Sequence, residues 1–245
     1  MTEDFNYRDL FLLTREVFGD RMSGQFSHGD DQTMGANLYD ALPISCVLNP
    51  VTKLFSATIL VGASRNVTVV RGGQFGSAGD RVSVLGALRA LDESCRLRLP
   101  DVYLAKFDVA FDRDLRLFGP RSDGPPAPSM PHAGFYELAL DFFGARISLP
   151  TSDKVGQRMA GVLYDSFLFS CGFDDQRMMF GASIRLSPEG GIGSFMGRRP
   201  SMRTDRDSLA ESLRLVDEYC RLRLPEKFLT VFDAAHGLSR PVLEG

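Results

Sequence analysis

The spacing of apolar positions predicts a helix near the start of the chain. Over residues 7–18, apolar side chains recur at helical spacing. The positions that define this face are Leu10, Leu13, Val17 and Phe18. Gly19 follows directly, and we expect it to end the helix in the left-handed conformation that glycine adopts easily.

Two segments rich in apolar and β-branched residues, 36–48 and 53–63, predict strands. The sequence Asn-Pro-Val-Thr at 49–52 lies between them and is typical of a turn. We therefore expect the two strands to form a hairpin.

A second helix should begin after Asp80, because aspartate is a favoured N-cap residue and a helical apolar stripe follows it. The stripe consists of Val82, Leu85, Leu88, Leu91 and Cys95. We expect this helix to run to about Leu99. Pro100 and Asp101 then suit the first turn of a third helix, where a missing N–H does no harm and a carboxylate meets the positive end of the helix dipole.

The same pattern occurs twice in the chain. Cys171 and Cys220 lie 125 residues after Cys46 and Cys95. The run Asp-Glu-Ser-Cys-Arg-Leu-Arg-Leu-Pro at 92–100 returns at 217–225, with only the serine replaced by tyrosine. A domain-sized repeat of this kind indicates an internal duplication. We predict that residues 7–112 and 132–237 adopt the same fold in a register shifted by 125.

A proline-rich stretch separates the copies. Residues 119–128 include four prolines, which cannot donate to a sheet and hold the chain extended. We predict a first repeat at 1–118, a linker at 119–131 and a second repeat at 132–245. Each repeat should be an α-β-β-(β)-α-α unit, so the predicted fold class is α+β, with antiparallel sheets flanked by helices and a pseudo-twofold relation between the copies.

Composition and charge narrow the class of protein. A chain of 245 residues with 44% hydrophobic and 24% charged residues can bury a sizeable core. The formal charge of -3 offers no general attraction to nucleic acid or anionic membranes. No apolar stretch approaches the roughly 20 residues that cross a bilayer, and the acidic start does not resemble a secretory signal. We expect a cytoplasmic protein without a membrane span.

The cysteines and histidines give no catalytic or metal-binding pattern. The four cysteines show no CxxC spacing and lie in apolar patterns, so we expect them to be reduced, buried packing residues. His28, His132 and His236 have no histidine at the equivalent position of the other copy. His28 with Asp30 and Asp31 could hold a metal, but such groupings are common in loops without one. We predict no metal site.

Glycines at 190, 191, 193 and 197 could suggest a phosphate-binding loop. They do not spell GxGxxG or a P-loop, and no Lys-Ser/Thr pair follows. We expect a flexible hairpin tip at this place.

The charged motif at the end of the second helix is retained in both copies. One interpretation is a solvent-exposed face with ion pairs three and four residues apart, such as Asp92 with Arg96. The alternative is that matching faces pair the two copies, as in an isologous dimer. On that alternative the candidate inter-repeat contact residues are Arg96, Arg98, Arg221 and Arg223.

One segment breaks the repeat. Residues 197–206 carry four arginines, whereas the equivalent residues 72–81 carry one. Guanidinium groups offer bidentate pairing to carboxylate or phosphate. This segment is a candidate site for an acidic or phosphorylated protein partner, and the alternative is a solvated loop. The candidate residues are Arg198, Arg199, Arg203 and Arg206.

No nucleophile–base pair, cofactor motif or metal cluster emerges, so we expect a binding protein without catalytic residues or cofactors. The order of elements resembles the type III secretion chaperones of the Tir-chaperone (CesT-like) class. The resemblance rests on an amphipathic helix that ends in glycine, the runs 163–171 and 178–184, and a helix from Asp205. It implies an acidic cytoplasmic α+β protein, here a dimer-like tandem in one chain, that holds an effector segment unfolded over exposed strands and apolar grooves.

Two other functions remain open. The chain could be a ligand-binding or enzymatic domain that uses the segment 197–206 for an anionic small molecule. It could also be a structural subunit of a larger assembly.

Overall fold

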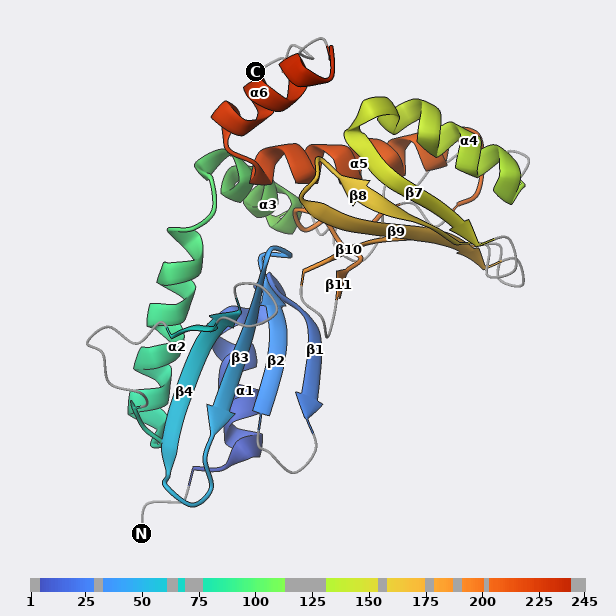
Figure 1. The fold of residues 1–245 in the computed structure, drawn as a ribbon. Helices are drawn as coiled ribbons and strands as arrows, with labels where there is room; N and C mark the ends of the chain where they lie inside the picture. Colours follow the sequence, from blue (N-terminus) through green and yellow to red (C-terminus); the bar gives the residue numbers. More distant parts are fainter. Residues whose placement is uncertain are drawn as a thin grey trace. The chain divides into compact units, whose positions relative to one another are not determined.

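The computed structural model describes most of the chain. The described residues are 5–28, 33–60, 66–68, 77–112, 131–153, 158–174, 179–186, 191–200 and 203–238. They form two compact units, one of Met1–Phe111 with Leu186–Ile192 and one of Asp112–Arg185 with Gly193–Gly245. Both units combine helices with an antiparallel sheet, which confirms the α+β class (Figure 1).

The first unit begins with a helix, continues with a meander of strands and ends with two helices. Its elements are α1 (Tyr7–Phe18), the 3-10 turn η1 (Gly19–Arg21), β1 (Met22–His28), β2 (Thr33–Leu38), β3 (Leu42–Leu48), β4 (Leu54–Leu60), β5 (Asn66–Thr68), β6 (Ser77–Ala78), α2 (Arg81–Arg96) and α3 (Asp101–Asp112). The strand order is β1-β2-β3-β4-β5, with β6 also paired to β4.

The second unit repeats the order of one helix, four strands and two helices. Its elements are α4 (His132–Phe143), η3 (Gly144–Arg146), β7 (Ile147–Asp153), β8 (Arg158–Leu163), β9 (Phe167–Asp174), β10 (Met179–Arg185), α5 (Arg206–Arg223) and α6 (Glu226–Ala235). The two-residue strand β11 (Gly191–Ile192) lies in the stretch 186–192, which groups with the first unit. The bounds of α4, β7, β8 and β10 are those of α1, β1, β2 and β4 shifted by 125 residues. Duplication as the origin of this match, and the pseudo-twofold relation, stay predictions.

The core of each unit lies between one face of its sheet and the first two helices. Met34, Cys46 and Ala57 are paired across β2, β3 and β4 and are all buried. In the second unit the same row consists of Met159, Cys171 and Ala182. Figure 1 shows α1 and α2 on one face of the first sheet, and α1 packs against α2. In β4, β8 and β10, buried residues alternate with less buried ones, as expected for one covered face, whereas in β2 all residues after Thr33 are buried.

The helix termini follow local capping chemistry. Asn6 and Asp9 form a capping box at the start of α1, and Asp80 Oδ1 accepts from the N–H groups of Val82 and Ser83. Gly19 ends α1, but with φ 52° and ψ -133° it lies outside the left-handed helical region that the sequence predicted. Glycine reaches this conformation because it has no Cβ.

The predicted stripe of α2 is partly wrong. Val84 is buried with Leu88, Leu91 and Cys95, and Leu85 is only partly buried. Val82 is exposed because two residues along a helix correspond to a rotation of about 200°, which puts it on the side opposite Val84. The predicted third helix is present: α3 starts at Asp101, directly after Pro100.

The predicted strand 36–48 is in fact two strands. Tyr39 and Asp40, with φ 56° and 52°, form a tight turn between β2 and β3. Aspartate adopts this conformation more often than most residues, but tyrosine rarely does, and composition alone therefore did not reveal the turn. The preceding strand β1 was also missed. The turn at 49–52 is confirmed, since Asn49 Oδ1 accepts from the N–H groups of Val51 and Thr52 at 2.9 Å.

A bulge interrupts the edge strand of each sheet at the same place. The register shifts between Ser23 and Phe26 in β1, where Gly24 has φ 61°. The equivalent residue in β7 is Leu149, which has φ 51° and is 79% exposed. A leucine therefore occupies a conformation that favours glycine.

The predicted linker 119–131 lies outside the described residues except for Pro131, which precedes α4. The predicted boundaries of the repeats therefore stay predictions.

Candidate functional site

A polar network joins the end of α1, the turn after β2 and the helix α2. Arg21 Nη1 lies 2.7 Å from Asp92 Oδ2, and the Tyr39 hydroxyl donates to Asp92 Oδ1 at 2.7 Å. Arg21 Nη1 also lies 3.3 Å from the Tyr39 oxygen. Asp92 thus uses both carboxylate oxygens for partners from other elements.

The local backbone places these side chains. Arg21 follows the glycine that ends α1, and its guanidinium donates back to the carbonyls of Phe18, at 3.1 Å, and Val17. The Tyr39 N–H donates to the Arg21 carbonyl at 2.8 Å. The arginine therefore satisfies carbonyl groups at the helix end and anchors the tyrosine turn.

The second unit repeats the network residue for residue. Arg146 Nη1 lies 2.9 Å from Asp217 Oδ2, and the Tyr164 hydroxyl donates to Asp217 Oδ1 at 2.7 Å. Arg146 also donates to the carbonyls of Phe143, at 3.0 Å, and Phe142.

An arginine from the last turn of the helix covers each tyrosine. The Arg96 guanidinium lies 5.7 Å from the centre of the Tyr39 ring, and that of Arg221 lies 5.9 Å from the Tyr164 ring. Arg96 pairs with Asp108 of α3 at 3.6 Å. The equivalent pair of Arg221 with Asp233 is 3.3 Å long and almost fully buried. In the described part of the chain, Asp233 Oδ1 has no hydrogen-bond partner.

These surroundings keep the tyrosines protonated. Burial, and then the hydrogen bond to Asp92, raise the pKa of Tyr39 above its ordinary value of 10.0. Burial, and then the charge of Asp217, likewise raise the pKa of Tyr164 above 10.0. Each hydroxyl is therefore a hydrogen-bond donor to a carboxylate at neutral pH, and the network acts as a structural connection between elements.

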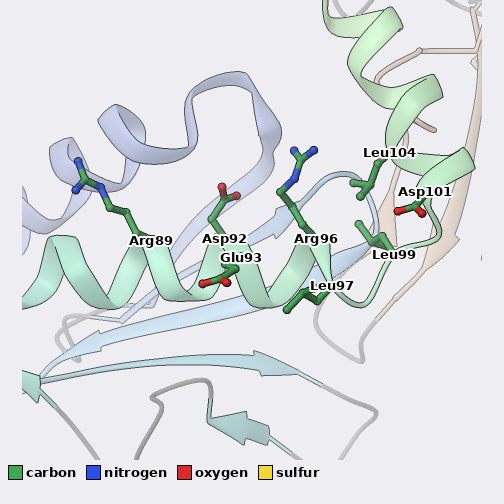
Figure 2. A pocket seen from close by; sticks show the side chains of 8 residues that line it. All are labelled: Arg89, Asp92, Glu93, Arg96, Leu97, Leu99, Asp101 and Leu104. Carbon is green, nitrogen blue, oxygen red and sulfur yellow. The ribbon is translucent and has the colours of Figure 1, made fainter.

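A depression of about 520 Å³ lies beside this network, where α2 meets α3. Figure 2 shows Arg89, Asp92 and Arg96 on one side of α2, with Leu99 and Leu104 at the junction of the two helices and Leu97 on the other side of α2. We call its eight lining residues the first elbow surface: Arg89, Asp92, Glu93, Arg96, Leu97, Leu99, Asp101 and Leu104. The depression is thus lined by three leucines, two arginines and three carboxylates.

The arginine-rich segment of the second unit begins with a tight two-residue turn. Phe195 and Arg198 exchange backbone hydrogen bonds of 2.7 and 3.0 Å, while Met196 and Gly197 have φ 53° and 73°. Positive φ at both central residues is typical of a type I′ turn. Phe195 and Met196 are buried, and the Phe195 ring lies 5.2 Å from that of Tyr219. A tight hairpin-type turn is therefore present at 195–198, and the flexibility expected for the glycine-rich stretch stays a prediction.

The four candidate arginines of this segment differ in their surroundings. Arg198 approaches Glu211 at 3.5 Å and Glu218 at 3.9 Å, both on α5. Arg203 pairs with Asp205 at 3.1 Å. Arg199 and Arg206 are exposed, and within the described residues they make no ion pair. They are the two side chains best placed to meet an external anion.

The predicted inter-repeat residues make contacts inside their own units. Arg96 and Arg221 belong to the networks above. Arg98 donates to the Ser94 carbonyl at 2.8 Å, and Arg223 donates to the Tyr219 hydroxyl at 2.7 Å. A contact between the repeats through these residues stays a prediction.

Sequence reasoning missed the partners of Asp92. It paired Asp92 with Arg96 along one helix face, but the ion pair of Asp92 is with Arg21. The available signal was the repeat itself, because Arg21, Tyr39 and Asp92 all recur at a spacing of 125. Residues retained together in both copies were candidates for mutual contact.

All four cysteines are free and buried, as predicted. Burial raises the pKa of the Cys46 and Cys95 thiols to about 12. His28 and His132 belong to β1 and α4, but their side chains, like Asp30 and Asp31, lie outside the described residues. His236 follows α6 and is exposed, with its ring 4.3 Å from that of Phe232.

Comparisons with known proteins give no relative: no family model, no curated protein and no solved structure matches this chain. In the part of the chain that the structure describes, no helix has the length and apolar character needed to cross a membrane.

Proposed function

We propose that this chain is a non-catalytic protein that binds an acidic segment of a partner polypeptide. The observation that carries the proposal is the tight turn at residues 195–198 of the second unit, which we call the arginine turn, together with the exposed arginines that follow it. Its buried Phe195 and Met196 hold the backbone of the turn, and Arg199 and Arg206 are exposed. An exposed guanidinium group can pair with a carboxylate or phosphate through two parallel hydrogen bonds.

The resemblance to secretion chaperones supports a polypeptide as the partner. A chaperone of this kind would hold its partner segment in an extended form without any chemical step. The exposed apolar side chains of the second unit, including Leu149 and Leu168, fit such a role.

The experiment compares capture and affinity with and without the exposed arginines. The tagged chain and its Arg199→Ser/Arg206→Ser variant are used to capture proteins from the native host, and the captured partner is then purified. We expect the variant to bind it about tenfold more weakly at low salt, and the difference to shrink as salt rises. The control is Arg8→Ser/Arg15→Ser, which removes two exposed arginines from α1.

Equal affinities of the variant and the control would reject the proposal. A small anion that co-purifies with the chain and is lost in the variant would instead support the anionic-ligand function. Recovery of stoichiometric assembly subunits that do not depend on these arginines would support the structural-subunit function.

A further inference from the structure

The arginine turn faces two carboxylates of α5. Arg198 Nη2 lies 3.5 Å from Glu211 Oε1, and Arg198 Nη1 lies 3.9 Å from Glu218 Oε2. We call these two ion pairs the Arg198 contact. In the first copy, 125 positions earlier, the counterparts of Arg198 and Glu211 are Gly73 and Gly86. The pair of Arg198 with Glu211 is therefore a feature of the second copy alone.

The Arg198 contact is weak. Both distances exceed the roughly 2.7–2.9 Å of a strong charge-assisted hydrogen bond. The side chains of Arg198 and Glu211 are 32% and 45% exposed, so water and salt screen their attraction. Glu211 is also shared between two guanidinium groups, because its Oε2 lies 2.9 Å from Arg214 Nη1. An external carboxylate can therefore replace Glu211 beside Arg198 at little cost in free energy.

The backbone of the arginine turn does not depend on these carboxylates. Phe195 and Arg198 exchange backbone hydrogen bonds of 2.7 and 3.0 Å, and the side chains of Phe195 and Met196 are buried. The Phe195 ring also packs 5.2 Å from the ring of Tyr219. Breaking the Arg198 contact therefore releases a guanidinium group and leaves the turn in place.

Arg198 also lies next to an arginine of the proposed site. Arg199 follows it directly, is exposed and makes no ion pair within the described residues. Consecutive Cα atoms are only about 3.8 Å apart, so an acidic segment that pairs with Arg199 brings its carboxylates within reach of the long Arg198 side chain. Those carboxylates compete there with Glu211 and Glu218.

We propose that the Arg198 contact is autoinhibitory: Glu211 and Glu218 hold Arg198 in the free chain and give it up to the carboxylates of the acidic partner segment. The inference rests on the proposed function and adds a third arginine to its site. Because only a chain with a released Arg198 offers all three guanidinium groups, the apparent affinity is reduced by the fraction of chains in which Arg198 is held.

The test measures the affinity of the full chain for acetylated hexaglutamate amide at low salt. Glu211→Gln keeps the length of the side chain and removes the charge that faces Arg198. We expect this variant to bind the peptide about threefold more tightly than the wild-type chain. The control for net charge alone is Glu137→Gln, which removes an exposed carboxylate from α4.

A double-mutant cycle assigns the gain to Arg198. The gain of Glu211→Gln over Glu137→Gln should disappear when both are compared in an Arg198→Ser background. It should persist in an Arg214→Ser background, which separates Arg198 from the other guanidinium group that Glu211 holds.

The side-chain Nε–H signal of Arg198 in the isotope-labelled chain reports on the contact directly. Hexaglutamate should shift this signal, and in Glu211→Gln it should do so at a lower peptide concentration. Hexaglutamine should not shift it. Thermal unfolding of Glu211→Gln should be nearly unchanged, because the turn keeps its backbone hydrogen bonds and its buried Phe195.

The outcomes separate the two proposals. A gain no larger than that of Glu137→Gln, or one that persists without Arg198, would overturn the autoinhibitory contact and leave binding through Arg199 and Arg206 intact. Hexaglutamate binding that is indifferent to Arg199→Ser/Arg206→Ser but keeps the Arg198-dependent gain would support the contact and reject the proposed site. Absence of binding to both the wild-type chain and Glu211→Gln would reject both.

Discussion

Tyr39 and Asp92 lie 53 residues apart in the chain, yet the tyrosine hydroxyl donates a hydrogen bond of 2.7 Å to Asp92 Oδ1. The bond connects the turn after β2 to the helix α2. The second unit contains the equivalent network of Arg146, Tyr164 and Asp217. A substitution in one network can therefore be compared with the equivalent substitution in the other.

The first prediction concerns the carboxylate. Asp92→Asn and Asp217→Asn keep the shape of the side chain but remove the charge that faces Arg21 or Arg146. We expect each to lower the free energy of unfolding by about 2 kcal/mol, because a partly buried guanidinium loses its charged partner. The effect should be larger at Asp217, which is less exposed, at 13% against 18% for Asp92.

Urea unfolding followed by circular dichroism measures these losses. Arg81 and Glu16 form an ion pair of similar length, 2.9 Å, but both are exposed. Glu16→Gln should therefore change stability by less than about 0.5 kcal/mol. Losses of the same size at Glu16 and Asp92 would show that the network is no stronger than a surface pair.

The second prediction is a pH dependence. The pKa values of Tyr39 and Tyr164 are raised above the ordinary value of 10.0, so the folded state favours protonated tyrosine. This stabilisation is fully present below about pH 10 and is lost as the pH rises through the folded-state pKa values. Unfolding midpoints should fall above pH 10, and the Tyr39→Phe/Tyr164→Phe variant should show a shallower fall. Parallel pH profiles would contradict the shift.

The third prediction concerns the bulge of β7. Leu149 has φ 51° and is exposed, so Leu149→Gly relieves backbone strain without removing core packing. We expect a gain of roughly 0.5 to 1 kcal/mol in the free energy of unfolding. The matched change Gly24→Ala should be destabilising, because its φ is 61° and a Cβ would lie 3.0 Å from the Asn37 side-chain nitrogen. Thermal unfolding of both variants is the measurement.

The fourth prediction concerns the cysteines. Because all four thiols are buried, they should react with a water-soluble disulfide reagent only at the rate of unfolding. Cys95→Ala and Cys220→Ala should each lower stability by about 1–2 kcal/mol through lost packing. Rapid labelling of all four cysteines in the native chain would show this to be wrong.

The sequence predicted the elements that depend on local signals. The α1 bounds followed from Leu10, Leu13 and the glycine that ends the helix, and the start of α2 followed from the Asp80 cap. The turn at Tyr39 and Asp40 was missed, because tyrosine rarely adopts positive φ and its place in the turn is held by a distant contact, the bond of its N–H to the Arg21 carbonyl.

The surroundings of the candidate site residues depend more strongly on contacts between distant parts of the chain than the helix ends do. Arg198 and Arg203 were predicted to meet a partner, but the fold places carboxylates of α5 and its N-cap beside them. Helical spacing could not indicate the elbow surface, because its leucines come together only where α3 turns away from α2.

The Arg21 network also constrains the order of folding. Arg21 and Asp92 are separated by 71 residues, so closing the chain between them costs conformational entropy before their contact can stabilise the fold. During synthesis, the end of α1 lacks this partner until α2 has left the ribosome. The first unit should therefore gain protection from hydrogen exchange at α1 late, and together with α2.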